Sequence, residues 1–318
     1  MTYTNSKSTK PDIHQEVTDK IINLLDDVDL NDYQPPFASL AAQGLPMNPT
    51  TDNHYQGVNI LALWFNQQKR KFTSNHWATF KQWKEKGAHV RKGEKGSRVI
   101  FYKTLLKEEE NSNGEHEEIK IPMLRLFTVF NANQVDGYEG HQTITPETDK
   151  VKRLELVDEF CQSTGADIRT GENEAYYAIA DDYINMPETS MFLNTSQISA
   201  TEQYYATLLH ELTHWTGAKK RLDRPGITEK VKPEDYAFEE LVAELGAAFL
   251  CAGHGITQTQ PKNHTIYIKS WLKALKDDKA HIFKAAAQAA RAVEYLNNFN
   301  KQNSHIPDAA SLIGVQNG

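Results

Sequence analysis

The apolar positions in the first part of the chain recur at helical spacing. Residues 12–27 place Ile13, Val17 and Ile21 on one face behind an Asp12 N-cap, which predicts an amphipathic helix. Residues 33–57 contain four prolines, which exclude long regular elements and predict an ordered loop. Residues 57–72 and 73–87 then predict two helices, the second beginning at a Thr or Ser cap and ending at Gly87.

From residue 89 the apolar period changes to two. Residues 89–106 predict strand, turn and strand, with the glycines of KGEKG in the connection, and residues 121–135 predict a further strand region. The polar, acidic segment 107–118 between them is interpreted as a flexible hairpin loop. We therefore expect a basic β-ribbon near the middle of the first half.

The second half predicts mostly helix. A helix is expected at 151–165, strands around a turn at Asp181 and Asp182 within 175–187, and helices within 199–217, 237–253 and 266–299. The elements together predict an α+β fold with two domains. Their expected bounds are 11–136 and 151–300, with a linker at 137–150 and disordered ends at 1–10 and 301–318.

Composition excludes several classes of protein. The chain has 318 residues, of which 39% are apolar and 24% charged, as in ordinary globular proteins. No stretch approaches the length of a membrane span, and the first 30 residues lack the apolar core of a secretory signal, so we expect no membrane association and a cytoplasmic location. Two cysteines, Cys161 and Cys251, are too few for a disulfide framework and are expected to be reduced core residues.

The net charge of −7 conceals one compact basic block. Residues 69–98 hold ten basic and two acidic side chains, a local charge of +8 that leaves −15 for the other residues. The basic residues are Lys69, Arg70, Lys71, Lys81, Lys84, Lys86, Arg91, Lys92, Lys95 and Arg98. Such a block is typical of a protein that binds a polyanion such as nucleic acid, although a solvated lysine-rich face is the alternative.

The sequence His210-Glu211-Leu212-Thr213-His214 is an HExxH motif. Histidines at positions i and i+4 lie on one face of a helix, where both imidazoles can hold one cation while the glutamate leans over it. Ser199 and Glu202 form a capping-box pattern before the motif, so it should lie within a continuous helix.

A catalytic metal needs a third protein ligand. Glu240 and Glu244 are four residues apart in a segment otherwise built for burial, and buried carboxylates require a partner. We assign Glu240 as the third metal ligand. We expect Glu244 to accept a hydrogen bond from the second ring N–H of a ligand histidine. Glu239 is the rival ligand and should point about 100° away on the helix.

These motifs resemble two known domains. YYATLLHELTHWTG and FEELVAELGAAFL resemble a zincin metallopeptidase domain whose third ligand is glutamate. GLPMNPTTDNHYQGVNILALW, WATFKQWKEKGAHVRKGEKGSRVIFY and FTVFNANQV resemble the N-terminal domain of ArdC-type antirestriction proteins, a domain whose relatives precede plasmid primases. The resemblance spans roughly residues 11–300, and the acidic insert at 107–118 departs from it.

The resemblance implies a plasmid or mobile-element protein that binds single-stranded DNA and helps incoming DNA escape host restriction. Lys and Arg would neutralise phosphates, and aromatic side chains within the basic block would stack on bases without a sequence preference. Trp77 is the ring expected to be exposed, and the β-ribbon residues Arg91, Lys92, Lys95 and Arg98 are the favoured phosphate contacts. The other expected contacts are Lys69, Arg70, Lys71 and Lys81.

The zincin resemblance implies hydrolysis of a peptide bond with Zn²⁺, although Mn²⁺ or another divalent metal fits similar ligands. Glu211 would take a proton from water and deliver it to the leaving amine, and Tyr236 or Arg221, both expected in the loop after the motif, would stabilise the oxyanion. A strand near 177–184 would bind substrate, and a restriction-system component is one conceivable protein partner.

Two alternatives stay open from the sequence. The protein could be a non-catalytic DNA-binding shield, because a structural metal site uses the same ligands. It could also be a cytosolic peptidase whose basic block binds an acidic protein, in which case salt-sensitive DNA binding is absent.

Overall fold

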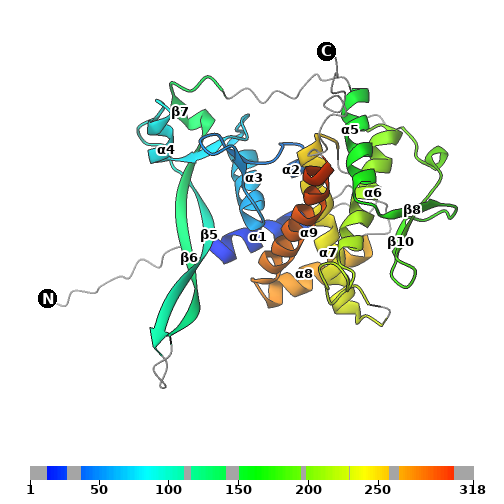
Figure 1. The fold of residues 1–318 in the computed structure, drawn as a ribbon. Coiled ribbons are helices and arrows are strands. Elements are labelled where there is room, and N and C mark those ends of the chain that lie inside the picture. Colours follow the sequence, from blue (N-terminus) through cyan, green and yellow to red (C-terminus); the bar gives the residue numbers. More distant parts are fainter. Residues whose placement is uncertain are drawn as a thin grey trace, which may run out of the picture. The chain divides into compact units, whose positions relative to one another are not determined.

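The structure is a computed structural model that describes most of the chain (Figure 1). The described residues are 13–26, 37–110, 116–140, 150–194, 198–228, 230–257 and 265–303. The predicted disordered N-terminus, most of the predicted linker and nearly all of the predicted C-terminal tail lie outside them. Contacts divide the chain into unit 1 (Met1–Asn23 and Gln43–Ile144) and unit 2 (Leu24–Ala42 and Thr145–Gly318). The domain bounds given above stay predictions, because contacts do not test independent folding.

Unit 1 is built on a three-stranded antiparallel sheet in the order β3-β6-β5. Its strands are β3 (Trp77–Thr79), β6 (His116–Asn131) and β5 (Ser97–Glu110). Helix α3 (Val58–Arg70) packs against β5. The remaining elements are most of α1 (Ile13–Asp26), whose last residues belong to unit 2, the strand pair β1 (Met47–Asn48) and β2 (Asn53–His54), helix α4 (Phe80–Glu85), η1 (Ala132–Gln134), and the strand pair β4 (His89–Val90) and β7 (Val135–Asp136).

Strand β3 separates two apolar clusters because its side chains alternate between the faces of the sheet. Trp77 packs with Leu63 and Val99, whereas Ala78 packs with Trp83 and Ala88. The Trp83 indole also donates a hydrogen bond to the Phe130 carbonyl at 2.9 Å. Both large rings are therefore core residues.

Three predictions for this unit are wrong. Residues 77–79 form a strand, and the following helix begins only at the Thr79 cap, whose side chain accepts from the Gln82 N–H. The predicted basic ribbon does not form, because β4 pairs with β7 and β5 pairs with β6. The segment 107–118 is largely strand, since β5 and β6 pair as far as Glu110 and His116.

The described part of unit 2 combines a small sheet with five longer helices, and Figure 1 shows how they are arranged. Strand β10 (Tyr183–Met186) lies between β8 (Asp167–Thr170), which is parallel to it, and β9 (Tyr176–Ala178), which is antiparallel. The helices are α5 (Lys150–Ser163), α6 (Ala200–Thr216), α7 (Pro233–His254), α8 (Thr265–Asp277) and α9 (His281–Asn303), with the short α2 (Ala38–Ala41) against α7 and η2 (Thr189–Met191) after β10. The helices and the turn at Asp182 confirm the predicted elements, except that the C-terminal region is two helices.

Helices α6 and α7 pack directly on each other, and α7 also packs on α9. The backbones of α6 and α7 come close at Gly246, where a Cβ atom would stand 2.5 Å from Cγ2 of Thr213. The predicted reduced cysteines are confirmed, since Cys161 and Cys251 are both free and buried. Within the described ranges, no helix is both long and apolar enough to cross a lipid bilayer.

Candidate metal centre

Helix α6 presents its two motif histidines inside the protein. Its first turn is closed by the predicted capping box, in which Ser199 accepts from the Glu202 N–H and Glu202 accepts from the Ser199 N–H, both at 3.2 Å. The helix then runs without interruption through His210 and His214. Because the two histidines are four residues apart, both rings face the same neighbour, helix α7.

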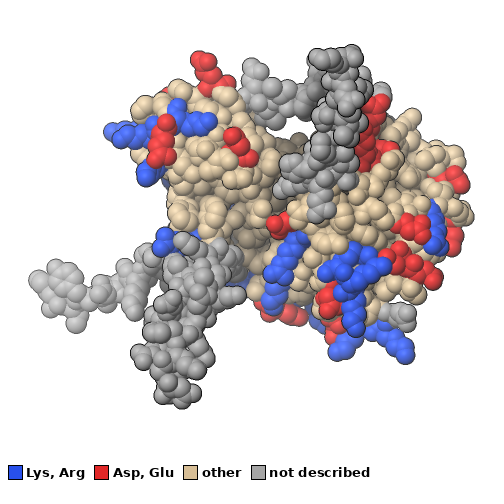
Figure 2. Space-filling view, viewed as in Figure 1, with Lys and Arg blue, Asp and Glu red and all other residues tan. Residues whose placement is uncertain are grey.

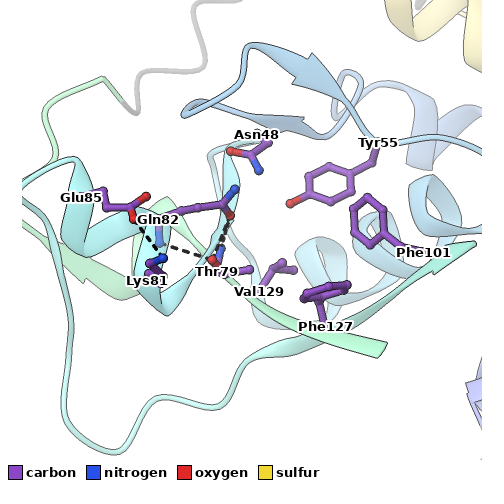
Figure 3. A pocket seen from close by; sticks show the side chains of 9 residues that line it. All are labelled: Asn48, Tyr55, Thr79, Lys81, Gln82, Glu85, Phe101, Phe127 and Val129. Carbon is purple, nitrogen blue, oxygen red and sulfur yellow. Dashed lines mark hydrogen bonds and ion pairs between the residues drawn. The ribbon is translucent and has the colours of Figure 1, made fainter. Parts of the chain in front are cut away.

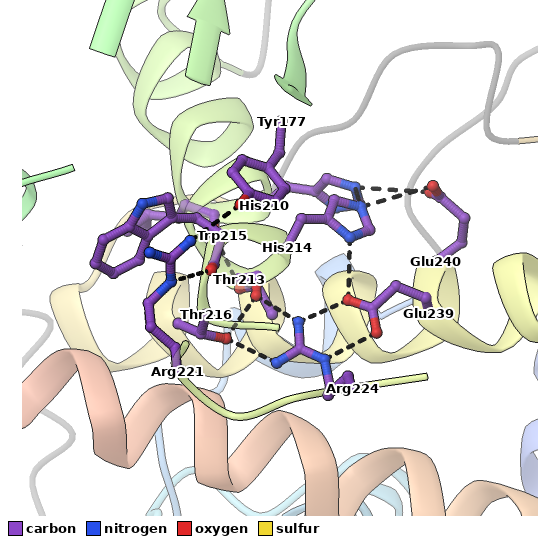
Figure 4. A network of polar contacts seen from close by, with 11 residues as sticks. Tyr177, His210, Thr213, His214, Trp215, Thr216, Arg221, Arg224, Glu239 and Glu240 are labelled. Atoms are coloured by element: carbon purple, nitrogen blue, oxygen red, sulfur yellow. Dashed lines mark hydrogen bonds and ion pairs between the residues drawn. The ribbon is translucent and has the colours of Figure 1, made fainter. Parts of the chain in front are cut away.

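Three buried side chains converge between these helices (Figure 4). The Nε2 atoms of His210 and His214 lie 3.1 Å apart, and the Glu240 oxygens lie 3.7 Å from His210 Nε2 and 3.6 Å from His214 Nε2. One ligand atom from each residue lies within 4.8 Å of the other two. The structure therefore brings together the three predicted ligands.

A buried ion pair supports the ring of His214 from behind (Figure 4). Glu239 Oε1 lies 3.1 Å from His214 Nδ1, and Arg224 donates to both Glu239 oxygens at 2.6 and 2.8 Å. Arg224 also donates to the hydroxyl of Thr216 and the carbonyl of Thr213. Glu239 therefore lies behind the ligand ring, a supporting contact that the sequence pattern assigns to Glu244.

The centre favours a positive charge. Burial lowers the pKa of His214, but the carboxylates of Glu240, Glu239 and Glu211 outweigh it and raise the pKa to about 9. Burial raises the pKa of Glu239, yet the hydrogen bonds from Arg224 and His214 bring it below its usual value. With an ionised Glu239 holding the Nδ1 proton, the Nε2 atom that faces His210 and Glu240 is the one left to bind a cation. The donor set thus fits a divalent metal.

Glu211 lies in the same centre with its carboxylate unengaged. Its side chain is buried, with a residue exposure of 6%. Among the described residues it forms neither a side-chain hydrogen bond nor an ion pair. A carboxylate in that state is available to exchange a proton with a bound molecule.

Tyr236 lies beside the ligand Glu240, although it belongs to the first turn of α7 and not to a loop as predicted. Burial, followed by the charge of Glu240, raises the pKa of its phenol, so the hydroxyl stays a proton donor.

Glu244 is fully buried on the same helix. Its predicted contact with a ligand histidine stays a prediction.

Arg221 is held away from the metal ligands by the β9–β10 turn (Figure 4). Its guanidinium donates to both oxygens of Asp182 and to the Tyr177 hydroxyl, and it stacks on Trp215 at 3.9 Å. Burial raises the pKa of Asp182, but the hydrogen bonds from Arg221, Lys220 and Tyr177 outweigh it and hold that pKa well below its usual value. Arg221 therefore anchors the sheet to the end of α6, which leaves Tyr236 as the candidate oxyanion donor.

Some of the predicted DNA contacts already pair with other residues of the protein, and others form no ion pair with any residue that the structure describes. Arg91 pairs with Glu94 at 3.0 Å and with Asp136 at 3.4 Å, and Lys81 pairs with Glu85 at 3.6 Å. Arg70 donates to the Lys95 carbonyl, and Arg98 also has a partner. Four exposed lysines form no ion pair within the described part of the chain: Lys69, Lys71, Lys92 and Lys95. Figure 2 shows basic side chains, with a few acidic ones, over the part of unit 1 that holds α4 and β7.

The prediction that Trp77 stacks on DNA bases is wrong. Its side chain is 0% exposed, and its ring packs edge-on against Phe72 with the ring centroids 5.8 Å apart. Among the side chains of unit 1 that the structure describes, the large exposed rings are instead Phe80, Phe101 and Phe127.

Family models match both halves of the chain. Residues 11–130 match the N-terminal domain of the anti-restriction factor ArdC, and residues 155–288 match a zincin-like metallopeptidase. The chain is 36% identical to protein y4eC of Sinorhizobium fredii, covering 93% of this chain and 95% of that one. It is 32% and 33% identical to two DNA primases TraC of Escherichia coli, spanning only 28% and 20% of their lengths.

Solved structures show the same similarity over most of the chain. The structure is similar to the antirestriction ArdC protein from the R388 plasmid, with 39% sequence identity. The TM-score is 0.72 for its metal-free form, covering 92% of this chain and 99% of that one, and 0.71 for its Mn(II)-bound form, covering 91% and 98%. With both domains matched in one chain, this protein belongs to the ArdC family of antirestriction proteins.

Proposed function

We propose that this protein binds single-stranded DNA through unit 1, without strong sequence preference, and protects incoming DNA of a plasmid or mobile element from restriction in the cytoplasm. The family supports the antirestriction role. The observation that carries the DNA binding is the set of four unpaired lysines, because phosphate contacts need cations that no carboxylate already neutralises.

These lysines come from two segments that lie side by side. Lys69 and Lys71 stand at the C-terminal end of α3, and Lys92 and Lys95 in the turn between β4 and β5. The hydrogen bond from Arg70 to the Lys95 carbonyl joins the two segments. One strand of DNA could therefore contact both pairs.

Replacing Lys92 and Lys95 with glutamine should weaken binding of a fluorescein-labelled oligothymidylate and flatten its salt dependence. Each lost phosphate contact should reduce the slope of log K against log salt by roughly 0.7, because fewer counterions are released. Fluorescence anisotropy over a sodium chloride series measures both quantities.

The matched control replaces Lys269 and Lys273 with glutamine, two exposed lysines of α8 in unit 2. It removes the same charge and should leave the slope unchanged. Equal losses from both double variants would mean that net charge, and not this surface, governs binding. Wild-type protein without salt-sensitive binding would favour the protein-binding alternative.

We also propose that His210, His214 and Glu240 hold a divalent metal, either zinc or manganese. Such an ion supplies Lewis acidity for hydrolysis of a peptide bond. The Glu211 carboxylate then takes a proton from the attacking water and passes it to the leaving amine, and the Tyr236 hydroxyl donates to the developing oxyanion. Strand β9 is an edge strand next to α6, so a substrate chain could pair with it.

Changing Glu211 to alanine separates this peptidase role from a DNA-binding shield. If proteolysis is essential, the variant should keep its metal and its affinity for DNA while losing protection of transferred DNA from a restricting host. Protection is measured as the transfer frequency into restricting and non-restricting recipients, with metal content determined on the same preparation. A folded, metal-loaded variant that still protects DNA would eliminate essential proteolysis and support the shield.

A further inference from the structure

A pocket of about 330 Å³ opens on unit 1 (Figure 3). Its volume lies at the lower end of the range of about 300–1,000 Å³ seen for small-ligand sites. It is lined by Asn48, Tyr55, Thr79, Lys81, Gln82, Glu85, Phe101, Phe127 and Val129. The pocket thus combines aromatic rings, amides and one cation.

Two phenylalanines on the sheet form the exposed aromatic part of the pocket. Phe101 is 48% exposed and Phe127 is 39% exposed, and their centroids lie 5.3 Å apart in an edge-to-face arrangement. They share one face because Phe127 pairs with Val99 and Phe101 pairs with Arg125 in the β5–β6 ladder. Large apolar rings that stay open to solvent beside a pocket are typical of a binding surface.

The amides of Asn48 and Gln82 face these rings across the pocket (Figure 3). Asn48 Oδ1 accepts from the N–H and the hydroxyl of Thr50 at 3.0 and 2.7 Å, and Gln82 Oε1 accepts from the Thr79 N–H at 2.9 Å. Both acceptors are therefore occupied. Within the described residues neither amide nitrogen donates a hydrogen bond, so the pocket offers donors to its ligand.

Charged side chains border the same opening. Lys81 lies on the rim with its side chain 87% exposed, and Glu85, the acidic residue of the lining, is the partner of that lysine. Arg125 lies opposite Phe101 on the same face of the ladder and is exposed. The two rings therefore lie at a charged and solvent-exposed rim.

We infer that this pocket takes an unpaired nucleobase of a bound DNA strand, stacked on Phe101 and Phe127. The inference rests on the single-stranded DNA binding proposed above and locates its base-binding site. Every base offers a π-face to the rings and acceptor atoms at its edge to the amides, so such a site tolerates any sequence.

The test compares oligothymidylate with an abasic oligonucleotide of equal length, which carries the same phosphates and no bases. Wild-type protein should bind the thymidine strand more tightly. Changing Phe101 and Phe127 together to alanine should weaken binding of that strand roughly tenfold and leave abasic binding and its salt slope unchanged. Phe80→Ala, which removes a ring that is 58% exposed and outside the pocket, is the matched control and should bind like the wild type.

Three other results would each contradict either the base-binding pocket or the proposed DNA binding. Unchanged binding of thymidine strands by the double variant would overturn the pocket while leaving the proposed DNA binding intact. An equal loss on both oligonucleotides would overturn it too, because the rings would then support the surface without contacting bases. Wild-type protein that binds neither strand would instead remove the proposed function on which the pocket rests.

Discussion

Replacing His210 with alanine is expected to leave the purified protein without stoichiometric divalent metal. The variant keeps His214 and Glu240 but loses one of three ligand atoms, and two ligands rarely retain a metal through purification. Elemental analysis by mass spectrometry should find about one metal ion per wild-type chain and close to none in the variant. His89→Ala, at an exposed histidine of β4, should retain the wild-type content.

Stability gives a second measure of the same site. A ligand that binds only the folded state stabilises it by RT ln(1 + [L]/Kd). Added Zn²⁺ or Mn²⁺ should therefore raise the melting temperature of chelator-treated wild-type protein and not that of His210→Ala. A variant that retained a full equivalent of metal and the same thermal shift would show that the ion binds elsewhere, which would contradict the proposed centre.

Changing Arg224 to methionine should strongly lower the free energy of unfolding. The variant leaves the Glu239 carboxylate buried without its main partner, and breaking one side of a buried pair typically costs about 3–5 kcal/mol. The His214 ring would also lose a fixed support, so metal affinity should fall about 10- to 100-fold. Urea unfolding in chelator and a competitive metal titration measure the two effects separately.

Two further variants control this result. Lys81→Met breaks an ion pair that is exposed on both sides and should change the free energy of unfolding by less than about 1 kcal/mol. Arg224→Lys keeps the charge but cannot donate a fork of two hydrogen bonds, so it should fall between the wild type and Arg224→Met. An Arg224→Met protein as stable as the Lys81→Met protein would show that the buried network contributes little.

The metal centre is the most predictable part of the molecule because its signals are local. Spacing of four residues places His210 and His214 on one helix face, and burial of a carboxylate within an apolar helix points to Glu240. Arg224 leaves no such signal, since it lies in a loop and its partners come from two helices. Only the structure shows its role, because there the loop after α6 places Arg224 beside Glu239.

Unit 1 is less predictable because its strands are short or polar. Apolar spacing places Trp77 in a helix, although the sequence Thr79-Phe-Lys-Gln82 is a capping pattern that puts the helix start after it. The acidic segment 107–118 has no apolar alternation, so only the pairing of β5 with β6 reveals it as strand. Phe101 and Phe127 come together through that register, which no local pattern encodes.

The contact between Gly246 and Thr213 limits how this centre can vary. A methyl group at position 246 would overlap the Thr213 side chain, so that side chain or the two helices would have to shift. We expect a variant with a larger side chain there to bind metal less tightly, although none of the three predicted ligands has changed. The candidate centre therefore depends on the absence of a side chain at position 246 as well as on the three side chains that would bind the ion.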